Sequence, residues 1–184
     1  MQETISIVIF GASGDLTHRK LIPSLYDLYL KGRLPKEWRI IGMSRSEYTD
    51  DEFREYVEAG VREFSPNTYD AAKWRQFAKN VVYFQGDISK PSEIKALGKT
   101  ITEWEGNRVW NRVYYLSVGP KLYEVVIENL GAADMVAEDR GWRRVVIEKP
   151  FGHDLASARE LNKSIHQVLL ESQTYRIDHY LGKE

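Results

Sequence analysis

Short apolar runs alternate with longer amphipathic stretches along the whole chain. Six of these runs have the length and continuity of buried strands, and they cover residues 5–10, 38–43, 81–85, 112–118, 142–148 and 174–177. Between them, apolar residues recur at helical spacing, and Gly or Pro marks most of the junctions. Strands that alternate with helices in this way predict an α/β fold with a doubly wound, mainly parallel sheet and helices on both faces.

Local signals place the helices more closely. Helices are expected over residues 15–32, 49–64, 69–79, 91–104, 122–130 and 154–170. Asp15 or Thr17 is expected to cap the first helix, and a capping box that begins at Thr49 is expected to start the second. Pro23 lies inside the first helical pattern and predicts a kink or a late start there, whereas Gly131 is expected to stop the fifth helix.

The first strand runs directly into the turn Gly11-Ala12-Ser13-Gly14-Asp15-Leu16. A strand, a glycine turn and a helix in sequence form a seat for phosphate, because free backbone N–H groups and the positive end of the helix point at the anion. With only two glycines, the turn is weaker than the full G-x-G-x-x-G pattern. Its place just after a strand near the N-terminus favours a Rossmann-like, dinucleotide-binding domain.

The second strand ends in Ser44, Arg45 and Ser46, and the next acidic residue is Glu47. A site that prefers NAD usually has a carboxylate here for the ribose 2′-hydroxyl, whereas an arginine suits a 2′-phosphate. The predicted cofactor is therefore NADP, with NAD as an alternative. The competing interpretation is an exposed loop arginine without a ligand.

Further candidates follow the third and fourth strands. Asp87 and Ile88 come after the third strand and are expected near the adenine end of the dinucleotide. Ser117, Gly119 and Pro120 come after the fourth strand and are expected on the nicotinamide side. Each of these segments also fits an ordinary turn.

Charged residues follow the last two strands. Lys149 ends the fifth strand, and Pro150 restricts it to extended conformations, which would aim the lysine at a substrate hydroxyl beside the nicotinamide. Asp178, His179 and Lys183 follow the sixth strand. His and Lys are good phosphate ligands and Asp can orient a histidine base, so His179 is a candidate for either role. A base from outside this chain is the other alternative.

Composition narrows the classes of function. The chain has 184 residues, a formal net charge of -1, 42% hydrophobic residues and no cysteine. The charge gives no broad basic field for nucleic acid or for a membrane surface, and cysteine chemistry is excluded. The histidines are scattered without metal-ligand spacing, so no metal site is predicted. The N-terminus lacks the pattern of a signal peptide and no apolar run is long enough to span a membrane, so a cytoplasmic location is expected.

Four motifs occur in order along the chain: Gly11 to Leu16 with Arg19-Lys20, Tyr115-Leu116-Ser117-Val118-Gly119-Pro120, Glu148-Lys149-Pro150-Phe151-Gly152, and Arg176-Ile177-Asp178-His179-Tyr180-Leu181-Gly182-Lys183-Glu184. Together they resemble glucose-6-phosphate dehydrogenase, and the last motif is the most specific. The resemblance implies an enzyme of the pentose phosphate pathway that oxidises glucose 6-phosphate at C1 to the lactone and reduces NADP. It also implies that the full-length protein is a homo-oligomer.

The same resemblance assigns roles. It implies that the glycine turn holds the pyrophosphate, that Arg45 takes the 2′-phosphate, and that Lys149 contacts both substrate and cofactor. His179 and Lys183 would bind the sugar phosphate, and Asp178 would pair with a catalytic histidine. In this family that histidine lies downstream, in a second α+β domain. Residues 1–184 are therefore expected to be the NADP-binding domain alone, a fragment of a longer protein that binds NADP without turning over glucose 6-phosphate.

Two other functions are open. A short-chain dehydrogenase or epimerase has a similar glycine turn, but it needs Tyr-x-x-x-Lys on the helix after the fourth or fifth strand. The only such spacing in this chain joins Tyr69 to Lys73, before the third strand, which counts against this class. A noncatalytic NADP-binding module, such as a sensor or a partner subunit, would have the same sequence features as a truncated enzyme.

Overall fold

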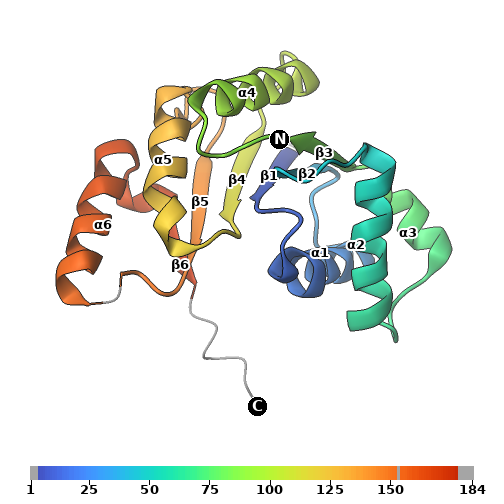
Figure 1. The fold of residues 1–184 in the computed structure, drawn as a ribbon. Coiled ribbons are helices and arrows are strands. Elements are labelled where there is room, and N and C mark those ends of the chain that lie inside the picture. The colour runs from blue at the N-terminus through green and yellow to red at the C-terminus, as the bar shows by residue number, and fades with distance from the viewer. Residues whose placement is uncertain (1–3, 153, 178–184) are drawn as a thin grey trace.

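A single six-stranded sheet forms the centre of the computed structural model, which describes residues 4–152 and 154–177 (Figure 1). The strand order is β3-β2-β1-β4-β5-β6, and every neighbouring pair is parallel. The chain winds outward from β1 in one direction and then from β4 in the other. This confirms the doubly wound α/β sheet that the sequence predicts.

The strands follow the predicted apolar runs, with ends shifted by one or two residues. They are β1 (Thr4–Phe10), β2 (Glu37–Ser44), β3 (Val81–Gln85), β4 (Asn111–Leu116), β5 (Arg143–Glu148) and β6 (Thr174–Ile177). Because all of them run the same way, their carboxyl ends meet along one edge of the sheet. That edge is where the predicted functional residues were expected.

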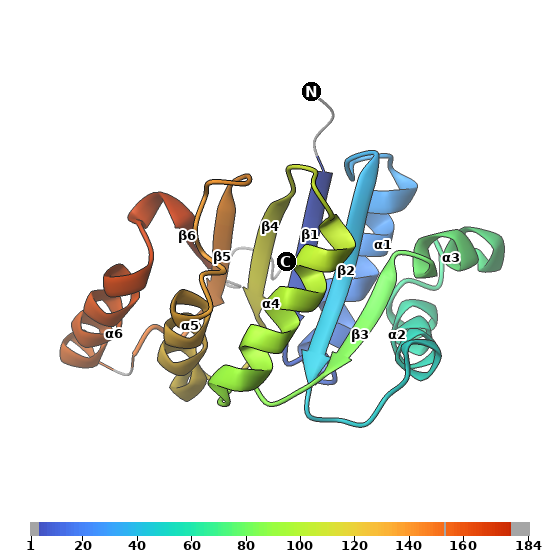
Figure 2. The ribbon, with the colours of Figure 1, turned by 90° about the horizontal axis from the view of Figure 1, so that it is seen from above.

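All six predicted helices are present. They are α1 (Ile22–Leu30), α2 (Asp50–Phe64), α3 (Ala71–Ala78), α4 (Pro91–Glu105), α5 (Tyr123–Ala132) and α6 (Leu155–Val168). A π-helical turn (Thr17–Leu21) precedes α1, and short 3-10 turns (Pro120–Leu122 and Glu171–Gln173) precede α5 and β6. Figure 2 shows α4 and α5 in front of the sheet and α1 behind it.

The start of the first helix differs from its prediction in one respect. The helical segment begins at Asp15, a π-helical turn interrupts it at Thr17–Leu21, and regular α-helix continues from Ile22 with Pro23 in its first turn. The predicted cap by Asp15 or Thr17 is wrong, because Leu16 precedes the π-helical turn and no side chain caps it. The Thr17 hydroxyl instead points back to the Gly11 carbonyl, at an oxygen–oxygen distance of 3.4 Å.

The other two local signals have opposite outcomes. The capping box at Thr49 is confirmed, since its hydroxyl accepts from the Glu52 amide and the Glu52 carboxylate accepts from the Thr49 amide. The predicted stop at Gly131 is wrong, because α5 continues to Ala132. A Cβ at Gly131 would lie 2.6 Å from a Val168 methyl group, so this glycine instead lets α6 pack closely against α5.

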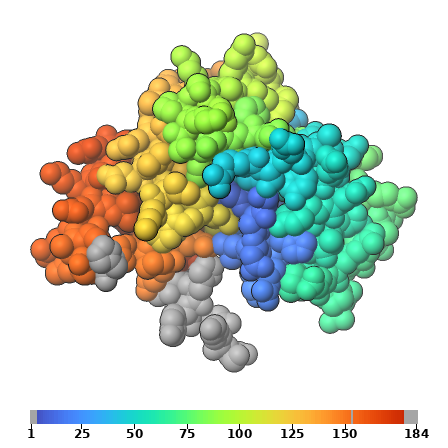
Figure 3. All heavy atoms as spheres, in the orientation of Figure 1, coloured from blue at the N-terminus to red at the C-terminus, as the bar shows by residue number. Residues whose placement is uncertain are grey.

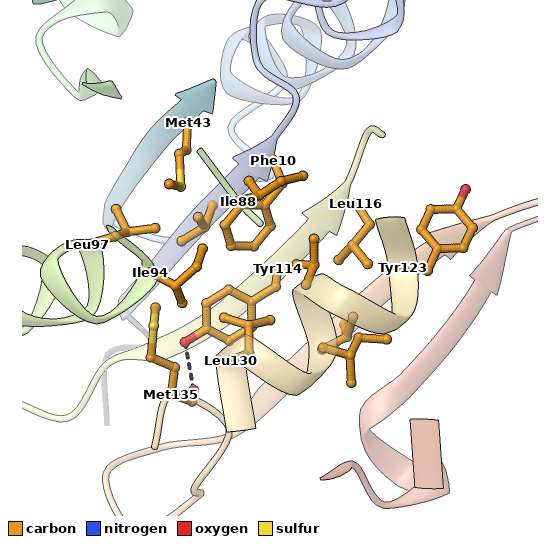
Figure 4. Close-up of a cluster of buried hydrophobic side chains, with 14 of the residues drawn as sticks. Phe10, Met43, Ile88, Ile94, Leu97, Tyr114, Leu116, Tyr123, Leu130 and Met135 are labelled. Atoms are coloured by element: carbon orange, nitrogen blue, oxygen red, sulfur yellow. Dashed lines mark hydrogen bonds between the residues drawn. The ribbon is translucent and has the colours of Figure 1, made fainter. Parts of the chain in front are cut away.

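Two hydrophobic clusters hold the layers together, one on each face of the sheet. The first lies between the sheet and α4, α5 and α6. Figure 4 shows part of it, in which the fully buried Tyr114 donates to the Met135 carbonyl at 2.7 Å. The second cluster lies between the sheet and α1, α2 and α3. Along β1, Val8 and Phe10 face the first cluster and Ile9 faces the second. This alternation is expected of a central strand that is covered on both sides.

One part of the sheet is less completely covered. Val113 and Val146, in β4 and β5, are half-buried and belong to neither hydrophobic cluster. Tyr175 in the edge strand β6 is 53% exposed. The face opposite α4, α5 and α6 therefore presents apolar side chains to its surroundings along these three strands.

A buried ion pair lies at the amino ends of the strands. The Glu105 carboxylate accepts three hydrogen bonds from Arg112, the shortest at 2.6 Å, and a fourth from the Ser6 hydroxyl at 2.8 Å. Both charged side chains are 7% exposed. The pKa of the nearby Arg143 is lowered, mainly by burial and next by the charge of Arg112. The single carboxylate of Glu105 therefore offsets the charge of a region that holds two guanidinium groups.

We expect Glu105→Gln to destabilise the chain by about 3–5 kcal/mol, because it leaves a buried guanidinium without its counter-charge. The matched control is Glu103→Gln, which alters an exposed carboxylate 3.9 Å from Lys99 and should change stability by less than about 0.5 kcal/mol. Urea unfolding followed by circular dichroism measures both. Equal, small effects of the two substitutions would contradict the importance assigned to the pair.

Candidate functional site

A groove of about 530 Å³ opens at the carboxyl ends of β1, β2, β3 and β4. It is lined by Gly11, Ser13, Gly14, Ser44, Arg45, Ser46, Gly86, Asp87, Ile88, Ser89, Ser117, Val118 and Leu122. In Figure 3 the blue atoms of the N-terminal segment are visible between the yellow atoms of α5 and the cyan atoms of the segment after β2. The groove lies where the strand order reverses, between β1 and β4, and this is where ligands bind in open α/β sheets.

Most of the predicted cofactor-binding residues share this groove. Those that line it are Gly11, Ser13, Gly14, Ser44, Arg45, Asp87, Ile88 and Ser117. They come from the ends of four different strands, and the chain separates the first from the last by more than half its length. The fold therefore brings the turn Gly11 to Leu16, here called the phosphate turn after its predicted role, into the same groove as the turn Ser44 to Ser46, here called the Arg45 turn.

The remaining predicted residues lie around it. Ala12 is fully buried in the cluster under α1, α2 and α3, whereas Asp15 is exposed and forms a 3.6 Å ion pair with Arg19. Leu16 is half-buried at the start of the helical segment. Gly119 and Pro120 are exposed at the start of the turn before α5.

The residues predicted to bind substrate are only partly described. Lys149 is exposed at the end of β5, and its amide donates to the Ile177 carbonyl at 3.2 Å. The Lys149–Pro150 peptide bond is cis. Asp178, His179 and Lys183 lie outside the described residues.

The phosphate turn is fixed by contacts with both neighbouring strands. The amides of Gly11 and Ala12 both donate to the Met43 carbonyl of β2, at 2.9 and 3.1 Å. Gly11 has a φ of +81°, and a Cβ there would lie 2.1 Å from the Ser117 carbonyl oxygen beyond β4. Only glycine allows this backbone conformation and this close approach together.

The turn leaves backbone donors available. Within the described residues, the amides of Ser13, Asp15 and Leu16 donate to no backbone carbonyl. Ser13 lies just before a continuous helical segment that extends to Leu30, and Asp15 and Leu16 are its first residues. Free amides at the start of a helix, where the dipole is positive, can bind an anion such as a pyrophosphate.

A cluster of hydroxyl groups joins this turn to the end of β2. The Ser13 hydroxyl oxygen accepts from the hydroxyls of Ser44 and Ser46, each at 2.9 Å. Arg45 lies between these two serines and is exposed. Two serines and a guanidinium on one turn provide the donors that a phosphate dianion requires.

Asp87 carries negative charge at the far end of the groove. Hydrogen bonds from the hydroxyl and amide of Ser89 lower the pKa of this carboxyl group, and the charge of Arg45 lowers it further. The Asp87 amide donates to the Glu93 carboxylate at 2.5 Å, which fixes the turn before α4. The carboxylates of Asp87 and Glu93 therefore both lie on the β3 side of Arg45.

A tyrosine and a glutamate meet beside Lys149. The Tyr115 hydroxyl donates to the Glu148 carboxylate at 2.5 Å, and the Tyr123 hydroxyl donates to the Glu148 carbonyl at 3.1 Å. Burial, and next the bond to Glu148, raise the pKa of Tyr115. Tyr115 therefore keeps its proton, and it holds the end of β5, where Lys149 follows.

Several groove residues were not among the predicted ones. Gly86, Ser89, Val118 and Leu122 line the groove but were not singled out as site residues, although Val118 lies within the Tyr115 to Pro120 motif. Their one signal in the sequence is position, since each lies within a few residues of the end of β3 or β4. Ser46 was recognised only as a neighbour of Arg45.

The spacing typical of a short-chain dehydrogenase lies elsewhere. The Tyr69 hydroxyl donates to Glu58 on α2, and Lys73 is exposed on α3, so neither side chain lines the groove. The described residues contain no group of three or more His, Cys, Asp or Glu side chains placed to hold a metal ion. Within the same part of the chain, no helix has the length and apolar character needed to cross a bilayer.

Residues 8–184 match the family described as glucose-6-phosphate dehydrogenase, NAD binding domain. The chain belongs to this family. Among curated relatives, it is 38% identical over 185 residues to glucose-6-phosphate 1-dehydrogenase from Schizosaccharomyces pombe, and 41% identical over 184 residues to the enzyme from Aggregatibacter actinomycetemcomitans. These matches cover 100% and 99% of this chain but 37% of each relative. The chain thus spans little more than a third of the length of these glucose-6-phosphate dehydrogenases.

Solved structures agree with the sequence relatives. A glucose-6-phosphate dehydrogenase in complex with glucose 6-phosphate matches with a TM-score of 0.88 and 37% identity, over 100% of this chain and 38% of that one. An NADPH-bound carbonyl reductase from chicken fatty liver matches with a TM-score of 0.52 at 10% identity, over 90% of this chain and 71% of that one. The second likeness shows a shared Rossmann-like fold and nothing about shared chemistry.

We expect Gly11→Ala to destabilise this glucose-6-phosphate dehydrogenase domain by about 2 kcal/mol or more, because the new Cβ meets a backbone oxygen at a positive φ. The control is Gly119→Ala, where a Cβ meets nothing within 4 Å and φ is -63°. Gly119→Ala should change stability by less than about 1 kcal/mol. Denaturant unfolding measures the stability of both variants. If Gly11→Ala left the free energy of unfolding unchanged, β4 would not constrain the turn.

Proposed function

We propose that this chain is the NADP-binding coenzyme domain of a glucose-6-phosphate dehydrogenase. The observation that carries the proposal is that the phosphate turn and Arg45 line the same groove. A dinucleotide with a 2′-phosphate needs both an amide-rich seat and a cationic turn within reach of one another. Membership of the family supports the dinucleotide, and the arginine supports NADP over NAD as the preferred cofactor.

The proposed assignment follows the groove from end to end. The amides of Ser13, Asp15 and Leu16 receive the pyrophosphate. Arg45, flanked by its two serines, receives the 2′-phosphate. The adenine is assigned to the side of Asp87 and Ile88. The nicotinamide is assigned to the side of Ser117, Gly119 and Pro120.

The proposed reaction concerns the whole protein. Bound NADP would accept the hydride from C1 of glucose 6-phosphate, and a base must take the proton of the C1 hydroxyl. Lys149 is the described residue that we assign to the substrate, while His179 and Lys183 are assigned to the sugar phosphate. Asp178 is assigned as the partner of a catalytic histidine outside this sequence.

We propose that a second, catalytic α+β domain follows this one in a homo-oligomeric full-length protein. The chain's coverage of little more than a third of its relatives supports this domain organisation. The incompletely covered face of β4, β5 and β6 offers apolar surface against which such a domain could pack. The cytoplasmic location stays a prediction from the sequence.

We expect Arg45→Asp to weaken binding of NADP by about 10- to 100-fold while NAD binding changes by less than about threefold, because only NADP loses a charge-assisted contact. The control is Arg75→Asp, an equal charge change on the exposed face of α3. Isothermal titration calorimetry gives all the dissociation constants. If both cofactors lose affinity equally, Arg45 does not select the 2′-phosphate.

We expect the isolated chain to bind NADP but to form no NADPH when glucose 6-phosphate is added, because the proposed base is outside the sequence. Absorbance at 340 nm follows the reaction, with the full-length protein as the positive control. NADPH production by the purified chain would contradict the assignment of the base to a second domain. Failure of the full-length protein to react would instead favour a noncatalytic NADP-binding module.

A further inference from the structure

A buried tyrosine lies directly beneath the proposed 2′-phosphate turn. The Tyr83 hydroxyl in β3 lies 2.6 Å from the Ser46 carbonyl oxygen and 3.0 Å from the Ser44 carbonyl oxygen. The same hydroxyl lies 2.7 Å from the Ser44 hydroxyl. One phenol group thus contacts the residues on both sides of Arg45 and leaves Arg45 itself exposed to the groove.

Packing holds the Tyr83 ring independently of these hydrogen bonds. The ring centroid lies 4.8 Å from that of Phe53 and 5.5 Å from that of Tyr48, and the residue is 9% exposed. Burial raises the pKa of the Tyr83 hydroxyl, so it carries its proton and can donate. The hydroxyl is therefore a donor that packing of the ring holds in place next to the turn.

The protons of the hydroxyl cluster can be counted. The carbonyl oxygens of Ser44 and Ser46 are acceptors only, so the Tyr83 proton can serve a carbonyl of this turn. The Ser44 hydroxyl has one proton but two contacts, with the Ser13 hydroxyl at 2.9 Å and with the Tyr83 hydroxyl at 2.7 Å, and the Ser46 hydroxyl also lies 2.9 Å from Ser13. Ser13 and the two serines all line the groove. The cluster therefore links the buried Tyr83 hydroxyl to side chains that line the groove between the glycine turn and Arg45.

We propose that Tyr83 is a positioning residue that determines specificity for the 2′-phosphate, by fixing the Ser44-Arg45-Ser46 turn so that its donors converge on one anion. This inference rests on the proposed function of the groove. It extends that function by naming a residue that touches no cofactor atom and acts through the turn. A ligand without the 2′-phosphate gains nothing from this arrangement.

A second tyrosine offers an internal comparison. The Tyr56 hydroxyl on α2 donates to the Ser13 carbonyl at 2.9 Å, so it supports the phosphate turn and not the Arg45 turn. The pyrophosphate is common to NADP and NAD. Loss of the Tyr56 hydroxyl should therefore weaken both cofactors alike, whereas loss of the Tyr83 hydroxyl should weaken only the phosphorylated one.

The test compares Tyr83→Phe, Tyr56→Phe and Tyr29→Phe, each of which removes one hydroxyl and keeps the ring. Tyr29 is the neutral control, because its hydroxyl donates to Gln76 in an exposed pair away from the groove. Titration calorimetry with NADP, NAD, 2′,5′-ADP and 5′-AMP gives the affinities. Tyr83→Phe should weaken NADP and 2′,5′-ADP about three- to tenfold, the size of one lost hydrogen bond, with NAD and 5′-AMP unchanged.

The outcomes separate the inference from the function on which it rests. If Tyr83→Phe weakened all four ligands equally, or weakened none, the role of Tyr83 would be overturned. The proposed function would still stand in that case, provided that the unaltered chain binds NADP. No preference for NADP in the unaltered chain would overturn both. A purely structural role for the hydroxyl would lower the midpoint of thermal unfolding and weaken all four ligands, which the unfolding curve of Tyr83→Phe shows directly.

Discussion

The contact of the glycine turn with the two strands beside it is the constraint on which the rest of the site depends. The amides of Gly11 and Ala12 bond to the Met43 carbonyl of β2, and the Gly11 backbone lies against the Ser117 carbonyl beyond β4. These contacts use the first two amides of the turn for structure, whereas the amides of Ser13, Asp15 and Leu16 donate to no backbone carbonyl among the described residues. They also bring the turn within hydrogen-bonding distance of Ser44. The glycine turn and the turn that carries Arg45 thus become parts of one surface because of where the backbone of β1 ends.

Side chains on the β3 side then refine this surface. Phe53 and Tyr48 hold the ring of Tyr83, and its hydroxyl holds the turn that carries Arg45. Hydrogen bonds among the hydroxyl groups of the cluster connect Tyr83 and Ser46 with Ser13, which lines the groove. On the other side, Tyr115 and Tyr123 hold Glu148, the residue before Lys149. Tyrosines therefore hold the residues on both sides of Arg45 and the residue before Lys149, and both of these cationic side chains are exposed.

The fold and much of the groove could be predicted because both depend on local patterns. Strand runs, the Thr49 capping box and the glycine turn are encoded within about six residues each, and the strand order then brings the tips together. Contacts between distant segments could not be predicted in this way. The sequence predicted that Gly131 stops a helix, but in the structure this glycine makes room for Val168 of α6. Similarly, no residue near Tyr83 in the sequence indicates that its hydroxyl contacts Ser46. Membership of the dehydrogenase family comes from the comparison with relatives, and this chain spans little more than a third of their length.

The central claim is that one groove receives the diphosphate on the glycine turn and the ribose phosphate on the neighbouring turn. The most direct measurement is a titration of the ¹⁵N-labelled chain with NADP, followed by the chemical shifts of its backbone amides. The account predicts the largest shift changes at Ser13, Asp15 and Leu16 and around Arg45, with the latter absent when NAD replaces NADP. Changes confined to other surfaces, or the same pattern with both cofactors, would contradict it.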